Sequence, residues 1–389
     1  MMKAINLISL LVTLAVTNAT AQAIVWNLKS LDQAKAKNSP EIRVIIKEAE
    51  SKLDKTLSTV VDKELTPSSG DKHDYMSMGR YWWPDPKKET GLPYIRKDGK
   101  SNPEIEKLDR YPLSDFATSI ESLALAYYLT TNEKYAEKAV ANLKVWFINE
   151  DTKMNPNMNY GQTIPGINNG LGRGEGILDT YSLFEMLDAV EILKKSESFS
   201  LEDQEAIEDW FKSYVNWLQT SAVAADEQQA TNNHGTAFDV QLARYAIFIG
   251  DLYLAHKVVN QFAENRLFTQ INPDGSQPLE LERTTAFGYS VFNLTHFLDM
   301  CKIASALKVD LLKAESKDGR SITKAIDFLV PYLSKPKAAF PYQQIKDWDG
   351  VKEKLIWQLY RVDQMLPKPQ YQKYYKVKLK ALKSSTAVY

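Results

Sequence analysis

Two short segments of the chain hold side chains that could together move a proton. Asn232-Asn233-His234-Gly235 supplies two amides and an imidazole, and Arg283 and Tyr289 supply a guanidinium and a phenol further along. This set suits the removal of a weakly acidic proton from a carbon atom beside a carboxylate. Because the removal places a second negative charge next to the first, hydrogen-bond donors must hold the carboxylate and stabilise the enolate-like state.

A role for each group follows from its chemistry. Asn233 and His234 are the candidates for holding the carboxylate. Tyr289 is the candidate base, because a tyrosine has an unperturbed pKa of about 10 and a neighbouring arginine such as Arg283 favours its ionised form. Once it has taken the proton, the phenol can return it to a leaving oxygen on the same face. The predicted reaction is therefore a syn β-elimination.

Structural interpretations of the same residues stay open. An Asn at a helix start is often only an N-cap, and a lone His in a helical protein often serves as a structural hydrogen bonder. Arg283 could be a surface ion-pair partner, and Tyr289 could be a core aromatic residue. A spacing of six residues does not place these two on one helical face, so we predict a local break at Gly288.

The elements that must position these groups are predicted to be helices. Apolar residues recur at spacings of three and four along most of the chain, and strand-like alternation is scarce. The amphipathic segments are 41–65, 115–129, 133–147, 176–194, 201–222, 236–249, 252–268, 289–306, 322–333 and 350–365. Many helices joined by short connections, without a solenoid-type repeat, predict an all-α fold: an α/α toroid, an incomplete barrel of paired antiparallel helices.

A long aromatic segment interrupts this pattern at about residues 71–112. A loop of that length in a folded protein is usually functional or disordered, and its aromatic density argues against disorder. Aromatic faces stack on sugar rings and basic groups bind carboxylates, so Arg80-Tyr81-Trp82-Trp83 is predicted to belong to a lid over an acidic glycan. The alternative is that these aromatic residues only hold the loop against the core.

A second interruption, residues 155–175, is polar and rich in glycine, as is typical of loops that carry binding groups. Glycine-rich turns between helices would also account for it. The predicted substrate-binding residues in this segment are Tyr160, Gln162, Asn168, Asn169 and Arg173, and Asn232, outside the segment, is predicted to bind substrate as well.

The first residues differ in composition from the rest of the chain. Lys3 precedes an apolar run, and small residues at cleavage spacing end at Ala21 and at Ala23. We predict a secretory signal peptide over residues 1–23, too short to span a membrane, followed by a single domain over residues 24–389. No cysteine lies near its end, so we expect a periplasmic or secreted protein without a lipid or membrane anchor.

Composition limits the partners of this domain. With 44% hydrophobic and 25% charged residues, the chain has the composition of an ordinary globular protein. Removing the predicted signal peptide takes one of the 48 basic residues and none of the 49 acidic ones, which leaves a formal charge of −2 and predicts no nucleic-acid partner. Cys301 is the sole cysteine, and no cluster resembles a metal site or a phosphate-binding loop, so no metal or cofactor is expected.

Several motifs together resemble a known family. They are His73-Asp74-Tyr75-Met76-Ser77, Tyr81-Trp82-Trp83-Pro84-Asp85-Pro86, Gly91-Leu92-Pro93-Tyr94-Ile95-Arg96-Lys97-Asp98-Gly99, Asn232-Asn233-His234-Gly235, and Asp274-Gly275-Ser276-Gln277-Pro278 leading into Glu282-Arg283. Their types and order are similar to those of the alginate lyase domain superfamily, and within it to polysaccharide lyase family 38.

This resemblance implies an α/α toroid that cleaves β-1,4-linked polyuronates by β-elimination without a required metal. Carried over by motif, Tyr289 is implied to be both base and acid, supported by His234 and Arg283. The resemblance also brings in Glu227 as a residue that could neutralise the substrate carboxylate, so Glu227 and Asn233 are both candidates for that task. The implied partner is an acidic polysaccharide, alginate or glucuronan.

The leading hypothesis is a lyase acting on mannuronate-rich alginate. Glucuronan is the alternative substrate for the same mechanism, and for guluronate His234 would act as the base with Tyr289 as the acid. A non-catalytic protein that binds acidic glycans is a second hypothesis. A third is a glycoside hydrolase that uses two carboxylates, for which Asp239, Asp251 and Glu227 are available, although their spacing does not single them out.

Overall fold

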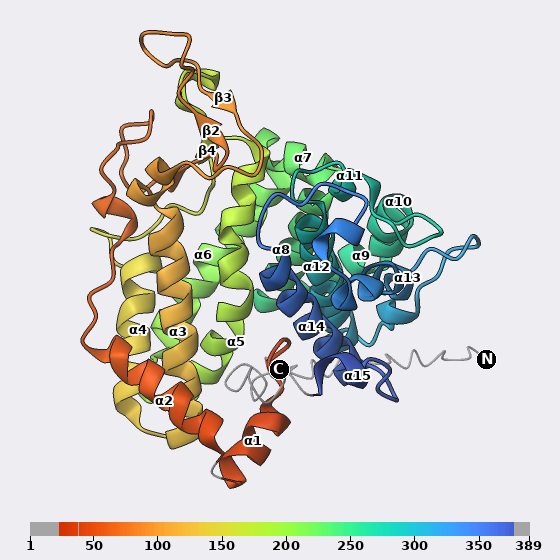
Figure 1. The fold of residues 1–389 in the computed structure, drawn as a ribbon. Coiled ribbons are helices and arrows are strands. Elements are labelled where there is room, and N and C mark those ends of the chain that lie inside the picture. The colour runs from red at the N-terminus through yellow and green to blue at the C-terminus, as the bar shows by residue number, and fades with distance from the viewer. Residues whose placement is uncertain (1–22, 38, 377–389) are drawn as a thin grey trace, which may run out of the picture.

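Helices make up most of the computed structural model, which describes residues 23–37 and 39–376 (Figure 1). The helices are α1 Leu28–Ala36, α2 Pro40–Leu53, α3 Arg110–Thr130, α4 Glu133–Phe147, α5 Leu183–Leu193, α6 Leu201–Thr220, α7 Ala222–Gln229, α8 Asn233–Phe248, α9 Leu252–Phe262, α10 Phe268–Gln270, α11 Pro278–Leu281, α12 Ala286–Ala306, α13 Ile322–Leu329, α14 Trp348–Met365 and α15 Gln372–Tyr375. The strands are β1 Met76–Met78, β2 Trp82–Trp83, β3 Ile95–Arg96 and β4 Tyr160–Thr163. Apart from Ala23, the predicted signal peptide lies outside the described residues.

Neighbouring helices pack in pairs around one apolar core. Helix α3 packs against α2, α4 and α5, and α8 packs against α9 and α12. Only Thr131 and Asn132 separate α3 from α4, and so short a connection makes neighbouring helices antiparallel. The buried apolar side chains of these helices belong to a single cluster. The fold is the predicted α/α toroid, and the strands of the described chain form only two small two-stranded sheets.

Helix α12 lies in the middle of the second half of the fold and carries Tyr289 near its start. Its buried residues lie on all sides, as expected of a helix enclosed by others, and it contacts α8, α9, α11, α13 and α14. The helix begins at Ala286, so Gly288 lies inside it and the predicted break at Gly288 is wrong. The chain instead leaves helical geometry at Thr285, which has φ −124° and ψ 58°.

The long aromatic segment is ordered by two small sheets. Strand β1 pairs in parallel with β4, and β2 pairs antiparallel with β3, with Trp82 opposite Arg96 and Trp83 opposite Ile95. We call residues 81–97 the lid hairpin; it projects from one end of the helical body (Figure 1). Helix α3 begins at Arg110, slightly before the predicted end of the loop.

The start of the described chain is tied to the core through one buried carboxylate. Asp188 on α5 accepts hydrogen bonds from the backbone N–H groups of Ile24, Val25 and Trp26 at 2.9, 2.6 and 2.8 Å. It also forms an ion pair with Arg244 of α8 at 2.9 Å, and both side chains are almost completely buried. Residues far apart in the sequence are thereby held together at one point.

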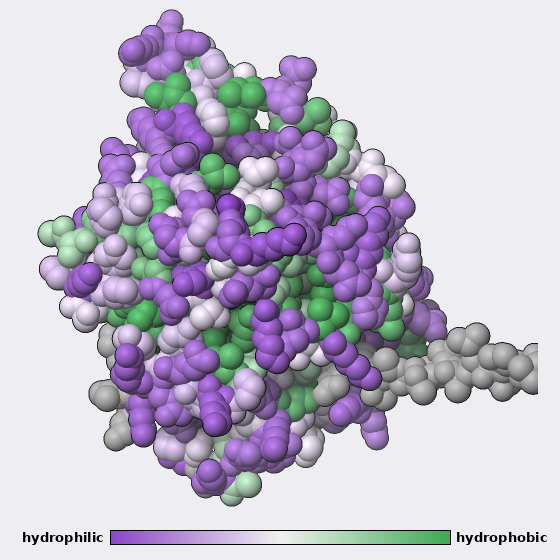
Figure 2. Space-filling model, turned by 90° about the vertical axis from the view of Figure 1, so that its right-hand side faces the viewer, coloured by the Kyte–Doolittle hydropathy of each residue, from purple (hydrophilic) through white to green (hydrophobic). Residues whose placement is uncertain are grey.

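Polar side chains dominate one face of the molecule. The face drawn in Figure 2 is predominantly hydrophilic, with hydrophobic residues showing between polar ones. Among the described residues, no helix has the length and apolar character needed to cross a lipid bilayer.

Candidate active site

The two segments singled out in the sequence come together with the lid at one end of the toroid. Helix α8 starts at Asn233, and α12 starts just after Arg283. The side chain of Asn232 accepts a hydrogen bond from the backbone N–H of His234 at 3.1 Å. Asn232 is therefore the N-cap of α8, which is the structural interpretation of this residue.

Gly235 explains why this helix can begin where it does. A Cβ atom at Gly235 would lie 2.0 Å from the carbonyl oxygen of Ala230 and 2.4 Å from Nη1 of Arg266. Arg266 itself donates to the carbonyl oxygens of Ala230 and Gln228, both at 2.7 Å. Only a residue without a side chain fits at this crossing, and the crossing holds the turn that leads into His234.

Tyr289 lies between an arginine and a second tyrosine. Its hydroxyl accepts a hydrogen bond from Nη2 of Arg283 at 2.7 Å and donates one to the hydroxyl of Tyr81 at 3.1 Å. The Arg283 guanidinium also lies over the Tyr289 ring, 3.8 Å from its centre. Tyr81 comes from the lid hairpin, so the site contains groups from the lid and from the start of α12.

The environment of Tyr289 corrects one expectation from the sequence. Burial raises the pKa of Tyr289 well above its usual value, and the neighbouring Tyr81 raises it further. Arg283 acts in the opposite direction, as predicted, but it offsets only part of this increase. In the absence of substrate Tyr289 is therefore a neutral phenol, because in a partly dry site desolvation outweighs one positive neighbour.

His234 and Glu227 form a buried pair beside the site. Nδ1 of His234 lies 2.7 Å from Oε1 of Glu227, whose side chain is only 3% exposed. Burial acts to lower the pKa of His234, but the attraction to Glu227 and the hydrogen bond between them outweigh it and raise the pKa. Nε2 of His234 has no hydrogen-bond partner among the described residues. It can therefore donate a proton to a bound anion.

Asn233 is placed differently from the sequence prediction. Its side chain is completely buried, and Nδ2 donates to both carboxylate oxygens of Glu280, at 3.0 and 2.8 Å. The backbone N–H of Asn233 donates to Glu280 as well, at 2.8 Å. The amide group that could have held a substrate carboxylate is therefore already engaged. The sequence analysis missed Glu280, because no local pattern connects two residues on separate helices.

The four predicted lid residues have different surroundings. Tyr81 contacts Tyr289, and Trp82 lies under the guanidinium of Arg173, 5.9 Å from the centre of its ring system. Trp83 is used within the lid: its Nε1 donates to the carbonyl oxygen of Lys100 at 2.9 Å. Nε of Arg80 is buried without a hydrogen-bond partner among the described residues. Tyr81 is thus the lid residue closest to the predicted chemistry.

The second polar segment meets the lid through Arg173. This side chain bonds Oε1 of Glu175 at 2.6 Å and Oε1 of Gln162 at 3.0 Å. Gln162 is buried, and its amide donates to the carbonyl oxygen of Glu175. Tyr160 is also buried. Gln162 and Tyr160 are therefore buried supporting residues, and Gln162 holds the Arg173 side chain. Arg173 is the member of this group that contacts the lid, at Trp82.

Asn168 and Asn169 lie apart from this cluster. Both are exposed, and both have left-handed backbone conformations, with φ of 53° and 51°. Asn168 donates to the carbonyl oxygen of Gly172 at 3.3 Å. Asn tolerates such a conformation better than most residues. Their surroundings match a tight turn, and no contact of either residue with the Tyr289 cluster occurs among the described residues.

The most important omission from the sequence analysis is Asp98, at the end of the lid hairpin. Its carboxylate forms an ion pair with Arg283 at 2.7 Å and accepts hydrogen bonds from the backbone and the hydroxyl of Thr284. In the sequence Asp98 stands only as one member of the motif from Gly91 to Gly99, directly before a glycine that indicates a turn, so nothing assigned it a partner. Among the described residues, no group of three or more His, Cys, Asp or Glu side chains could hold a metal ion.

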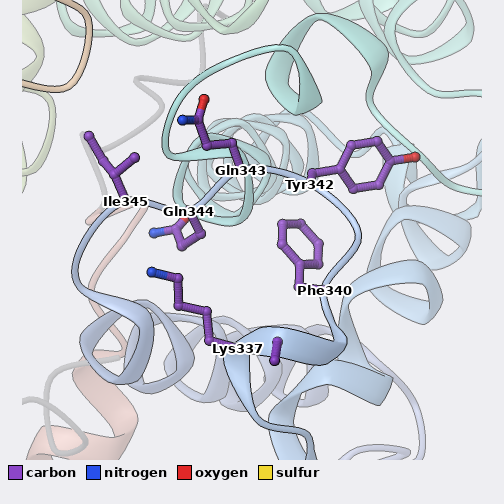
Figure 3. Close-up of a pocket in the computed structure, with 7 residues that line it drawn as sticks. Lys337, Phe340, Tyr342, Gln343, Gln344 and Ile345 are labelled. Atoms are coloured by element: carbon purple, nitrogen blue, oxygen red, sulfur yellow. The ribbon is translucent and has the colours of Figure 1, made fainter.

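Two cavities flank these residues. One, of about 570 Å³, is lined by the connection between α13 and α14, including Lys337, Phe340 and Gln344. Figure 3 shows this connection curving around the cavity, with Phe340 turned inward and Tyr342 turned away. The second, of about 80 Å³, is lined by Asn232, Glu280 and neighbouring polar side chains. Neither cavity is lined by Tyr289 or His234.

A family model and several solved structures that match this chain are described as alginate lyases. A family model described as alginate lyase matches residues 59–339. An alginate lyase from Bacteroides ovatus with a known crystal structure shares 51% sequence identity with this chain, and the two structures superpose with a TM-score of 0.89. The match covers 91% of this chain and 94% of the Bacteroides ovatus chain. No curated protein matches this sequence.

More distant structures share the fold. Alginate lyase A1-III from Sphingomonas species A1 is 16% identical, with a TM-score of 0.53 over 82% of this chain and 86% of that one. A variant of A1-III complexed with a tetrasaccharide is also 16% identical, with a TM-score of 0.57 over 83% and 86% of the two chains. At this level of identity the likeness concerns the fold alone.

Proposed function

The chain belongs to the alginate lyase family and is a polysaccharide lyase, and we propose that it cleaves mannuronate-rich alginate by syn β-elimination. The observation that carries the proposal is the placement of the Tyr289 hydroxyl, 2.7 Å from Nη2 of Arg283 and 3.1 Å from the hydroxyl of Tyr81. A phenol held in this way beside a cation, with an imidazole–carboxylate pair nearby, matches the requirements of proton abstraction next to a carboxylate.

The first step of the proposed mechanism is neutralisation of the substrate carboxylate. We assign it to His234 and Glu227, because Asn233 is engaged by Glu280. Glu227 raises the pKa of His234 and so keeps its imidazole protonated. Nε2–H of the imidazolium then donates to the carboxylate, which stabilises the negative charge that develops when the neighbouring proton leaves.

Tyr289 performs the proton transfers in the second step. The Tyr289 phenol first gives its hydroxyl proton to water, and the phenolate, stabilised by Arg283, then takes the proton from C5. The electrons of the C–H bond form the double bond between C4 and C5. The bond from C4 to O4 breaks, and the new phenol returns the proton to O4. In mannuronate the C5 proton and O4 lie on the same face of the ring, so one tyrosine can serve both ends of the reaction.

The lid supplies the proposed sugar-binding surface. We propose that Tyr81, Trp82 and Arg173 contact the polymer, because they form one continuous group next to Tyr289. Stacking of aromatic rings on sugars and pairing of arginine with carboxylates are the chemistry that an acidic polysaccharide requires.

The test is a panel of polymers incubated with the purified protein. We expect ultraviolet absorbance from an unsaturated uronate to appear fastest with polymannuronate and more slowly with polyguluronate and glucuronan. Fastest turnover of glucuronan would replace the proposed substrate and keep the mechanism. Products one water heavier, with saturated ends, would indicate a hydrolase, and no absorbance with any of the three polymers would disprove the proposal.

We also propose that the protein is exported. The support is the apolar segment and the cleavage spacing within residues 1–23. Intact mass measured on protein recovered from the periplasm or medium should place the new N-terminus at Gln22 or Ile24. Retention of full-length protein in the cytoplasm would contradict the proposal.

A further inference from the structure

We propose that Asp98, at the end of the lid hairpin, is a positioning residue that sets the orientation of Arg283 toward Tyr289 when the lid is seated. The inference deepens the lyase function proposed above and rests on it for its kinetic readout. It assigns to a lid carboxylate a task that neither the family motifs nor the local sequence indicates.

Asp98 holds the segment that leads into α12 through four contacts. Its Oδ1 accepts from Nη2 of Arg283 at 2.7 Å, and Oδ2 lies 3.4 Å from Nε of the same guanidinium. Oδ2 also accepts from the backbone N–H and the hydroxyl of Thr284, at 3.2 and 2.8 Å. The side chains of Asp98 and Arg283 are 21% and 17% exposed, so this pair is mostly shielded from water and is stronger than a surface ion pair.

The contact with Asp98 affects Tyr289 because the same nitrogen of the Arg283 guanidinium bonds both residues. Nη2 of Arg283 carries two hydrogens, and one is directed at Asp98 while the other is directed at the Tyr289 hydroxyl, 2.7 Å away. Because the guanidinium is planar and rigid, fixing one hydrogen fixes the direction of the other. The hydrogen bonds of Asp98 go to Arg96, Arg283 and Thr284 and not to Tyr289, and it therefore acts on the base through Arg283.

The same hairpin carries a second contact to the base. Tyr81 precedes β2, Lys97 follows β3, and the N–H of Lys97 donates to the carbonyl oxygen of Tyr81 at 2.7 Å. Tyr81 in turn accepts a hydrogen bond from the Tyr289 hydroxyl. The hairpin and the residue that directly follows it therefore reach the catalytic pair at two points, through Tyr81 at Tyr289 and through Asp98 at Arg283.

The residue after Asp98 is a glycine, which allows the end of the hairpin to pack closely against Thr284 and Ile345. Gly99 has φ +74°, and a Cβ atom there would lie 2.6 Å from Oγ1 of Thr284 and 2.7 Å from Cδ1 of Ile345. Nζ of Lys346 donates to the carbonyl oxygen of Gly99 at 2.7 Å. The connection that bears Ile345, seen in Figure 3, thus closes over the end of the hairpin. We call Asp98, Gly99, Arg283, Thr284 and Lys346 the lid anchor.

The charges around Tyr289 distinguish a positioning role of Asp98 from mere attachment of the lid, because only the positioning role changes the pKa of Tyr289. Tyr81, Arg283 and Asp98 act on Tyr289, Glu280 also acts on Arg283, and Arg96 forms an ion pair with Asp98 at 2.9 Å. Asp98 shares the positive charge of Arg283 and contributes to raising the pKa of Tyr289. Removing its charge therefore misorients Arg283 but also leaves more of the Arg283 charge to stabilise the phenolate.

The kinetic test compares Asp98→Asn with Asp98→Glu and with Glu89→Gln, a matched loss of one carboxylate from the exposed tip of the same hairpin. For Asp98→Asn we expect kcat on the best polyuronate to fall by about 10- to 100-fold because of misorientation, while KM changes less than about 3-fold. The midpoint of its pH–rate profile should move to lower pH by about one unit. Asp98→Glu should keep the wild-type midpoint and recover part of kcat, and Glu89→Gln should match the wild type.

A second measurement needs no turnover. In Asp98→Asn without substrate, hydrogen exchange of the amides in residues 81–97 should become faster, while exchange in α8 and α12 stays unchanged. Wild-type kcat and an unmoved pH midpoint in Asp98→Asn would overturn the inference. Equal losses in Asp98→Asn and Asp98→Glu with an unmoved profile would also overturn it, because they indicate anchoring alone.

The two proposals fail in different ways. If the wild-type protein forms no unsaturated product from any polyuronate, the lyase mechanism fails. Hydrogen exchange then still decides whether Asp98 holds the lid: faster exchange in residues 81–97 supports the lid anchor, and unchanged exchange overturns it.

Discussion

At the scale of single residues, this site depends on pairs that change the chemistry of each member. Tyr289 alone is a buried phenol with a raised pKa, and Arg283 is what makes its ionised form reachable. Burial alone would lower the pKa of His234, and Glu227 raises it. The functional unit is therefore the pair, and substitutions of either member test different steps of the reaction.

The first prediction concerns the base itself. Tyr289→Phe removes the hydroxyl proposed to take and return the proton, so we expect kcat to fall by about 10²- to 10⁴-fold with little change in polymer binding. Production of unsaturated uronate and binding of the intact polymer measure the two effects. A non-catalytic glycan-binding protein would behave identically with and without the hydroxyl, and a hydrolase would keep its turnover.

The second prediction concerns pH and the neutralising pair. Because Glu227 raises the pKa of His234, the imidazolium persists to higher pH in the wild type than it would without Glu227. In Glu227→Gln, burial dominates and lowers that pKa, so the imidazolium is lost at lower pH. Above the pKa, each unit of this decrease reduces the charged fraction about ten-fold.

The expected result is a KM that rises more in Glu227→Gln than in the wild type as pH increases from about 6 to about 8, on either side of the ordinary histidine pKa of about 6.5. Initial rates over a range of polymer concentrations at each pH give these KM values. An identical pH dependence of KM in the two proteins would show that His234 does not bind the carboxylate as an imidazolium.

At the scale of elements, the starts of two helices position the proposed catalytic groups. Helix α8 begins at the Asn232 cap and delivers His234, while α12 begins at Ala286 and delivers Tyr289. The glycines next to these residues have opposite surroundings. Gly235 is enclosed by the Ala230 carbonyl and the Arg266 side chain, whereas the nearest atom to a Cβ at Gly288 would be 3.5 Å away, an ordinary contact.

The third prediction uses these two glycines as a matched pair. Gly235→Ala should destabilise the protein by about 2 kcal/mol or more, because the new methyl group overlaps the Ala230 carbonyl and Arg266. Gly288→Ala should stabilise it by about 0.5 to 1 kcal/mol, because alanine is the better helix former. Urea unfolding of both variants checks the difference, and equal effects would mean that the crossing at Gly235 is not tight in solution.

At the scale of the whole molecule, buried ion pairs join parts of the chain that are distant in sequence. Asp188 connects the residues that follow the predicted signal peptide with α5 and α8. On α12, Asp299 forms a similar buried pair with Arg361 of α14. These contacts close the toroid around its apolar core, so the loss of one partner leaves a buried charge without compensation.

The fourth prediction tests this closure. Asp188→Ala leaves Arg244 buried and unpaired and frees three backbone N–H groups, so we expect a loss of about 3 to 5 kcal/mol in the free energy of unfolding. Asp209→Ala is the control, because Asp209 pairs with Lys212 on the surface and exposed pairs contribute little. Denaturant unfolding of both variants gives the comparison; similar values would show that the Asp188 contacts do not support the fold.

Sequence alone determined the helical class of this protein and predicted the groups of its candidate site. Apolar residues at helical spacing predicted the toroid, because the buried face of a helix requires apolar side chains every three or four residues in the local sequence. The motifs around His234, Arg283 and Tyr289 indicated a lyase, because the chemistry requires those residue types. Both the helical class and the lyase interpretation follow from local sequence patterns alone.

Tertiary structure decided the partners. Asp98 and Arg283 are 185 residues apart, and Asn233 and Glu280 are 47 apart, so no local pattern could connect them. Burial, which only the packed fold sets, raised the pKa of Tyr289 where the sequence suggested a lowered one. The same packing turned Asn233 toward Glu280 and Asp98 toward Arg283, because hydrogen bonds form between groups that the fold brings into contact, whatever their distance along the chain.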